Sequence, residues 1–141
     1  MKRATSTGKE SCSSVTEPRF LLDTNICVYL TENISDSLNQ RVEACELGSL
    51  VTSSIVFAEF ARGVDWSKPY AEETVARLFD MIAVLPFDQV AARVYAELPF
   101  VRHRFDRLIA AHALALDLTL VTANPRDFLD IPKLQIEDWT R

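Results

Sequence analysis

Short apolar runs alternate with stretches of helical periodicity along most of the chain. The first run, Phe20-Leu21-Leu22, ends abruptly in Asp23, Thr24 and Asn25. A short apolar run that closes in polar residues predicts a buried strand whose polar groups lie at its carboxyl end. Any of the three polar residues can cap the helix that we expect from Asn25 to about Glu32.

The same alternation continues to the end of the sequence. Further strands are expected at residues 50–53, 83–86 and 118–122, with an edge strand at 134–136. Helices are expected between them, around residues 38–47, 54–64, 71–82, 88–98 and 105–116. Strands that alternate with helices predict an α/β fold with a parallel sheet covered by helices on both faces. Right-handed crossovers then bring the ends of the first, second and fourth strands toward one edge.

Residues 1–19 differ from the rest because they are rich in Ser, Thr, Lys and Glu and poor in aliphatic side chains. We interpret them as a flexible N-terminal extension, and residues 20–141 as one folded domain. The extension lacks the apolar core of a secretory signal.

Composition narrows the class of protein. Hydrophobic residues make up 48% of the 141 residues and charged residues 25%, which is typical of a globular protein. No apolar run approaches the roughly 20 residues needed to span a bilayer, so no membrane association is expected. The cysteines show no CxxC spacing, which favours a reducing, cytoplasmic location. The net charge of −5 argues against nucleic-acid binding through bulk charge alone.

Four acidic residues are expected at or near the carboxyl edge of the sheet. Asp23 ends the first strand, Glu59 lies in the helix after the second, Asp106 begins a helix and Asp127 follows the fourth strand. Converging carboxylates repel one another unless a cation neutralises them. Because oxygen-only ligands suit Mg²⁺ or Mn²⁺, we expect a metal site that can activate water at a phosphodiester.

The segments that carry these acids have a recognisable order. They are Phe20–Asn25, Ser53–Phe60, Phe105–Ala113 and Leu120–Phe128. Together they closely resemble the PIN-domain ribonucleases, and among these the VapC-type toxins of bacterial type II toxin–antitoxin pairs. The resemblance extends from Phe20 to about Trp139.

The resemblance implies a three-layer α/β/α sandwich around a central, mostly parallel sheet of about five strands. It also implies a Mg²⁺-dependent endoribonuclease, in which Mn²⁺ can substitute. The implied assembly is a homodimer, neutralised by an antitoxin protein whose C-terminal segment fills the active-site groove.

The resemblance also implies roles for the acids. Asp23 and Asp106 match the direct metal ligands, and Glu59 matches a neighbour that holds a water on the metal or a second metal. Asp127 matches the fourth acidic position, with Asn124 as the alternative because other PIN domains carry an acid at that place.

Further polar residues surround these positions. The polar neighbours of the acids are Thr24, Asn25, Thr122 and Asn124. Four arginines could contact RNA phosphates, although a solvated face explains any one of them equally well: Arg62, Arg104, Arg107 and Arg126. His112, within an apolar helix, is expected to be a packing residue. Apolar candidates for a dimer surface are Ile34, Leu38 and Tyr70.

Two other functions compete with a nuclease. One is a catalytically silent PIN-like module that binds RNA or protein. The other is a phosphoryl-transfer domain that forms an aspartyl phosphate. The sequence disfavours the latter, because no second Asp stands two residues after Asp23 and no Lys follows the fourth strand.

Overall fold

A computed structural model describes residues 16–100 and 104–141 of the chain. Residues 1–15 of the predicted N-terminal extension lie outside the described residues. The strands are β1 (Phe20–Leu22), β2 (Leu50–Ser53), β3 (Ala83–Leu85), β4 (Thr119–Val121) and β5 (Ile136–Glu137). The helices are α1 (Thr24–Glu32), α2 (Asp36–Glu43), α3 (Ser54–Gly63), α4 (Ala71–Met81), α5 (Gln89–Ala96), α6 (Asp106–Ala115) and the 3₁₀ helix η2 (Pro125–Phe128).

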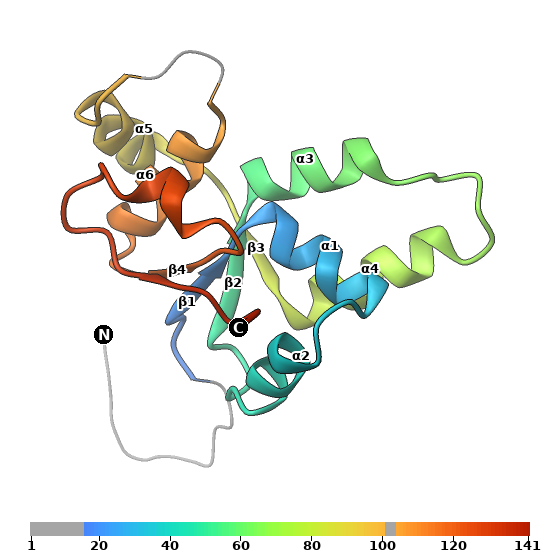
Figure 1. Cartoon of the computed structure of the whole chain (residues 1–141). Coiled ribbons are helices and arrows are strands. Elements are labelled where there is room, and N and C mark those ends of the chain that lie inside the picture. Colours follow the sequence, from blue (N-terminus) through green and yellow to red (C-terminus); the bar gives the residue numbers. More distant parts are fainter. Residues whose placement is uncertain (1–15, 101–103) are drawn as a thin grey trace, which may run out of the picture.

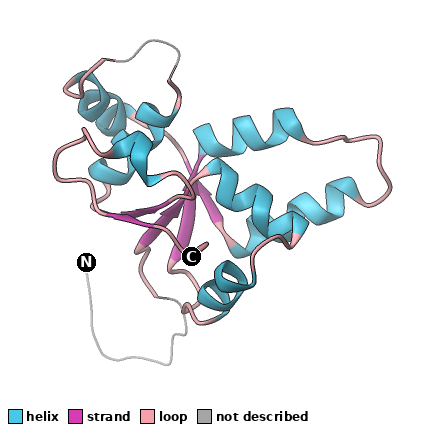
Figure 2. Cartoon of the chain, viewed as in Figure 1, coloured by secondary structure: helices cyan, strands magenta, loops and turns pink. Residues whose placement is uncertain are grey.

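The five strands form one parallel sheet in the order β3-β2-β1-β4-β5. Figure 1 shows α5 and α6 on one side of the sheet and α1, α3 and α4 gathered on the other. The strands thus form the middle of three layers (Figure 2). This arrangement confirms the predicted α/β/α fold. The strand order reverses between β1 and β4, and at such a switch point the loops after the two strands diverge and leave a crevice at the carboxyl edge.

Side-chain caps begin several of the helices. Asp23, Ser53 and Asp88 accept hydrogen bonds from backbone N–H groups at the starts of α1, α3 and α5, as their positions in the sequence predict. Ser35, which the sequence reading did not single out, caps α2 in the same way. The boundaries of the regular elements therefore follow mostly from local chemistry.

Among the boundaries that differ from the prediction, two have a clear cause. The second helix, expected to continue to Leu47, ends at Glu43, and the chain then turns through Gly48, whose positive φ of 91° suits glycine. The edge strand β5 starts at Ile136 instead of ending there, because its pairing with Leu120 fixes the register.

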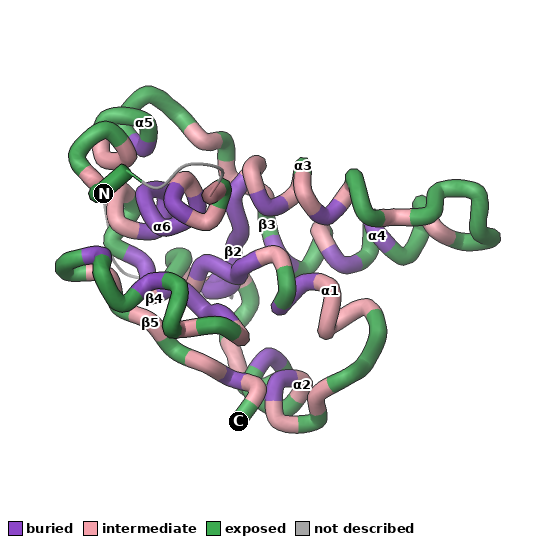
Figure 3. The backbone as a smooth tube through the Cα atoms, turned by 45° about the horizontal axis from the view of Figure 1, so that its top comes forward, coloured by how far each residue is buried: buried purple, intermediate pink, exposed green. Residues whose placement is uncertain are grey.

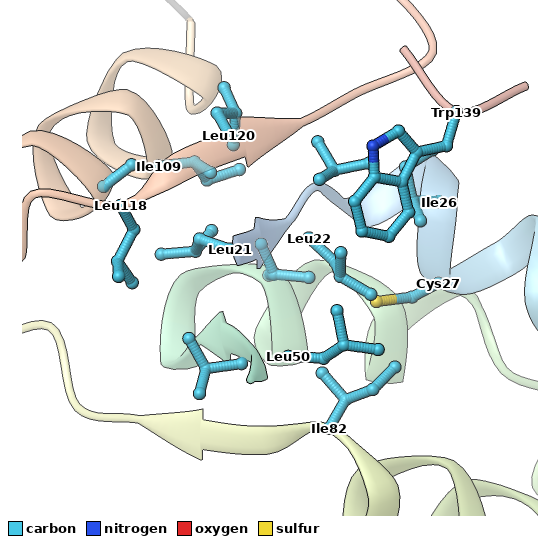
Figure 4. Packing of buried hydrophobic residues seen from close by; sticks show 14 of the residues in the cluster. Leu21, Leu22, Ile26, Cys27, Leu50, Ile82, Ile109, Leu118, Leu120 and Trp139 are labelled. Carbon is cyan, nitrogen blue, oxygen red and sulfur yellow. The ribbon is translucent and has the colours of Figure 1, made fainter. Parts of the chain in front are cut away.

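The core lies between the sheet and the inward faces of the helices, as the burial pattern in Figure 3 shows. Leu21 and Leu22 of β1 are fully buried, and so are Ile26 and Cys27 of α1. Figure 4 shows these side chains packed with Leu50, Ile82, Leu120 and Trp139, which come from distant parts of the chain. No helix within the described ranges is long and apolar enough to cross a membrane.

The C-terminal segment closes one end of this core. The Trp139 ring packs edge-to-face on Phe20, with ring centroids 4.9 Å apart, and Arg41 of α2 lies 4.7 Å from the centre of the Trp139 ring. The Ser37 hydroxyl donates a hydrogen bond of 3.0 Å to the Trp139 carbonyl oxygen. The segment therefore joins β1 to α2.

This packing corrects one candidate for a dimer surface. Leu38 of α2 has no exposed surface because it belongs to the core. Ile34 and Tyr70, the other two candidates, are 56% and 72% exposed.

Candidate active site at the carboxyl edge of the sheet

Asp23 lies where β1 ends and α1 begins, beside the switch point. This residue is 8% exposed. The Thr24 N–H donates to Asp23 Oδ1 at 2.8 Å, and the Thr122 hydroxyl, just after β4, donates to Asp23 Oδ2 at 2.9 Å. The start of α1 and the residue after β4, which lie on the two sides of the switch point, thus both hydrogen-bond to the Asp23 carboxylate.

Burial raises the pKa of Asp23 above its ordinary value. The hydrogen bonds from Thr122 and Thr24 act against this shift, while the nearby charges of Glu59 and Asp106 raise the pKa further. Burial and the neighbouring acids therefore disfavour the ionised form of Asp23 unless a positive partner lies nearby.

Glu59 reaches the same region from α3. The Thr24 hydroxyl donates to Glu59 Oε1 at 2.6 Å, so Thr24 contacts Glu59 through its side chain and Asp23 through its backbone. Since α1 and α3 pack side by side, the helix after β2 carries its acid back to the end of β1.

Asp106 and Asp127 come from two further elements. Asp106 is the first residue of α6, and Asp127 lies within η2. Arg104 lies between them: its guanidinium forms an ion pair with Asp106, and its Nη2 lies 3.8 Å from Asp127 Oδ1. All three side chains are at least partly open to solvent.

One cavity, which we call the acid cavity, joins these residues. Its volume is about 310 Å³, and its walls carry all four predicted acids, Asp23, Glu59, Asp106 and Asp127. The other residues of its wall are Thr24, Asn25, Arg104, Phe105, Ile109, Asn124 and Phe128. The structure thus gathers four acids that the sequence separates by up to 104 positions, from Asp23 to Asp127.

The acid cavity offers only oxygen ligands from its charged groups, which is the donor chemistry of hard divalent cations. The raised pKa of the Asp23 carboxyl reflects the burial and mutual repulsion that a bound cation would relieve. Among the residues that the structure describes, no three Asp, Glu, His or Cys side chains are gathered closely enough to form a ready metal-ligand set. The residue types and their charges therefore fit a divalent ion, although the four acids are not gathered into a finished ligand set.

The predicted polar neighbours differ in their contacts. Thr24 and Thr122 hydrogen-bond directly to the acids. Asn25 and Asn124 line the acid cavity, and the Asn124 N–H donates to the Thr122 hydroxyl at 3.1 Å. Thr122 therefore connects the loop after β4 to the Asp23 carboxylate.

The four arginines lie in different environments. Arg104 lines the acid cavity, while Arg62 and Arg126 are exposed near the ends of α3 and η2. Arg107 departs from the expectation of an accessible phosphate contact: it is 4% exposed, and its Nη1 lies 2.9 Å from Asp130 Oδ1. This guanidinium stabilises the fold around η2.

His112 confirms the expectation of a packing residue. It is buried, its Nδ1 lies 2.8 Å from the Ser53 hydroxyl, and its ring packs edge-to-face on Phe87. Burial lowers the pKa of His112, which favours the neutral ring.

Two features of this region are not predicted from the sequence. The first is the ion pair of Arg104 with Asp106, for which the Arg-x-Asp spacing at the start of a helix is a faint signal. The second is a groove of about 440 Å³ between α1, α3 and α4, here called the helical groove. Its wall includes Val28, Phe60 and Val75, and it shares Thr24 and Glu59 with the acid cavity.

Comparison with known proteins adds independent findings. The family model described as the PIN domain matches residues 20–134. The chain is 34% identical over 133 residues to Ribonuclease VapC2 of Rickettsia felis, and 34% identical over 131 residues to the tRNA(fMet)-specific endonuclease VapC of Shigella flexneri. Each alignment covers 86% of this chain and 98% of the relative. The structure is also similar to a chain in the crystal structure of VapBC2 from Rickettsia felis bound to a DNA fragment from its promoter. The TM-score is 0.73 and the sequence identity 31%, over 85% of this chain and 98% of that one.

Proposed function

The chain belongs to the PIN domain family, and from this premise we propose that it is an endoribonuclease toxin whose partner is an antitoxin protein. The observation that supports the proposal most strongly is the acid cavity, in which four carboxylates from separate elements share one space at the carboxyl edge of the sheet. Relatives of nearly the same length are named ribonucleases or endonucleases.

We assign the metal-holding role to Asp23 and Asp106, with Glu59 and Asp127 completing the set and Asn124 as the alternative to Asp127. Mg²⁺, or Mn²⁺ in its place, would supply Lewis-acid activation of a water and of the scissile phosphate. Thr122 and Thr24 hold the Asp23 oxygens at fixed positions, and the Thr24 hydroxyl orients Glu59. Such supporting hydrogen bonds keep carboxylates ordered before an ion binds.

RNA phosphates need positive or hydrogen-bonding groups at the rim of the acid cavity. Exposed Arg62 and Arg126 are suited to this role, as is Arg104 once its guanidinium leaves Asp106. Arg107 contributes indirectly, because it donates a hydrogen bond of 3.4 Å to the Asp127 carbonyl oxygen.

For the antitoxin we propose the helical groove. It is partly apolar, it opens to solvent, and through Thr24 and Glu59 it is continuous with the acid cavity. A segment that fills the groove would reach the acids and exclude RNA. For the homodimer we propose an interface that includes the exposed side chains of Ile34 and Tyr70.

The competing function is a silent module that binds RNA or protein without cleaving RNA. One observation favours it: the Asp106 carboxylate is already paired with Arg104. Metal binding and RNA cleavage therefore decide between the two.

The test compares RNA cleavage by the purified protein with Mg²⁺, with Mn²⁺ and with EDTA. Asp23→Asn removes the most buried of the four acids and should abolish cleavage. Asp80→Asn on α4 is the matched control, because Asp80 is exposed and lines neither the acid cavity nor the helical groove. Cleavage that persists in EDTA, or in Asp23→Asn at the level of Asp80→Asn, would contradict the proposal.

A further inference from the structure

Arg104 is the one cationic side chain among the described residues that line the acid cavity. Its Nε lies 3.1 Å from Asp106 Oδ1 and 3.0 Å from Oδ2, and its Nη2 also pairs with Oδ2. The planar guanidinium thus engages both oxygens of this carboxylate, which is the geometry that distinguishes arginine from lysine.

The same guanidinium reaches a second acid. Arg104 Nη2 lies 3.8 Å from Asp127 Oδ1, so a single positive charge lies between the carboxylates of α6 and η2. The interaction raises the pKa of Arg104, with Asp106 as the main cause and Asp127 as a smaller one. Because an arginine side chain stays protonated in proteins, this positive charge is permanent.

The balance of charge explains why this arrangement is stable. Four carboxylates and one guanidinium line the acid cavity. Without a positive group, repulsion among the acids would favour a more open cavity. A divalent ion that binds Asp106 must compete for the oxygens that Arg104 contacts.

We propose that Arg104 is an internal counter-ion of the acid cavity: it neutralises Asp106 and Asp127 while no divalent ion is bound, and the ion must displace it to bind. This inference rests on the proposed function, because it assumes that the acids bind a divalent ion. Arg104 is thereby a positioning residue that sets the metal concentration at which the site fills.

The exposure of the pair limits the effect that we expect. The Arg104 and Asp106 side chains are 34% and 18% exposed, so solvent screens part of their attraction. A partly exposed pair contributes modestly, and we expect its loss to tighten metal binding by about three- to tenfold.

The test is a calorimetric titration of the full chain with MnCl₂, compared with Arg104→Met and Arg104→Lys. Methionine keeps much of the side-chain length without the charge, and lysine keeps the charge without the two-pronged contact. Arg104→Met should bind Mn²⁺ more tightly than the wild type, and Arg104→Lys should lie between them. Arg77→Met on α4 is the control, since it removes an equal charge from an exposed position outside the acid cavity and should leave the affinity unchanged.

Thermal melting gives a second readout. In EDTA, Arg104→Met should melt below the wild type because the acids lose their counter-ion, and saturating Mn²⁺ should remove the difference. Unchanged or weaker Mn²⁺ affinity in Arg104→Met overturns the counter-ion while leaving a metal-dependent nuclease intact. If the wild type and all variants fail to bind Mn²⁺, both this inference and the metal dependence are wrong.

Discussion

Thr122→Val tests whether Thr122 supports the central carboxylate of the site. The Thr122 hydroxyl is fully buried, donates to Asp23 Oδ2 at 2.9 Å and accepts the Asn124 N–H at 3.1 Å. Valine has almost the same shape, so the substitution removes these two hydrogen bonds without leaving a cavity.

The expected loss of stability follows from the charge on Asp23. A hydrogen bond to a buried charged group contributes roughly 1.5–3 kcal/mol, and the unpaired Asn124 N–H adds a smaller penalty. We expect the free energy of unfolding at pH 7 in EDTA to fall by about 2–3 kcal/mol. For a domain of this size that lowers the melting temperature by roughly 6–12 °C.

The pH dependence has a definite sign. The pKa of Asp23 is raised in the folded protein, so its contribution to stability is fully present below the unfolded value of 3.8 and is lost as the pH rises through the folded pKa. The Thr122 hydrogen bond limits this loss because it lowers the pKa of Asp23. Thr122→Val should therefore destabilise the protein more at pH 7 than near pH 4.

Urea unfolding in EDTA at the two pH values measures these quantities. Thr119→Val is the matched control, because Thr119 belongs to the adjoining strand β4 and its hydroxyl has no hydrogen-bond partner among the described residues. In an Asp23→Asn background the cost of Thr122→Val should fall to about 1 kcal/mol, the value for a neutral hydrogen bond. An equal cost in both backgrounds would refute the charge-assisted interaction.

Three further predictions concern the rest of the fold. Trp139→Ala should lower the free energy of unfolding by about 3–5 kcal/mol, because Trp139 is 1% exposed and packs on Phe20. Urea titrations measure this loss, and a value below about 1 kcal/mol would contradict the place of Trp139 in the core. Burial raises the pKa of Cys27 from 9.0 to about 12, so between these pH values the thiol ionises in the unfolded chain but not in the folded protein. The free energy of unfolding of the wild type should therefore fall more steeply between pH 9 and 12 than that of Cys27→Ser, and parallel curves of stability against pH would refute this. Asp130→Asn should lower the melting temperature at pH 7, because it leaves the buried Arg107 guanidinium without its carboxylate. The difference from the wild type should vanish at a pH low enough to protonate Asp130, whose pKa Arg107 lowers, and a difference that is the same at acid pH would contradict the ion pair.

Local chemistry explains which parts of the fold could be predicted from the sequence. The run Phe20–Leu22 predicts a strand because a short apolar segment is flanked by polar residues, and Asp88 predicts a helix start because its side chain accepts a backbone N–H three residues later. The gathering of Asp23, Glu59 and Asp106 follows from parallel strands, whose carboxyl ends share an edge.

The remaining features depend on contacts between distant parts of the chain or on side-chain directions outside regular elements. Leu38 is buried because Trp139, about a hundred positions later, belongs to the same core beside α2. The register of β5 depends on its pairing with β4. The Arg104 ion pair depends on the direction of a side chain in an irregular segment, which has no sequence period. The first two leave no local pattern in the sequence, and the Arg-x-Asp spacing is only a faint signal of the third.

The joining of β1 to the C-terminal segment has a consequence for synthesis. Phe20 leaves the ribosome early, yet its packing partner Trp139 is translated more than a hundred residues later, and Asp23 likewise waits for Thr122. Because such distant pairings form slowly and only after both partners exist, a nascent chain lacks a finished acid cavity until the residues after β4 have been made. The acid cavity can therefore assemble only after Asp127, the last of its four acids along the chain, has left the ribosome.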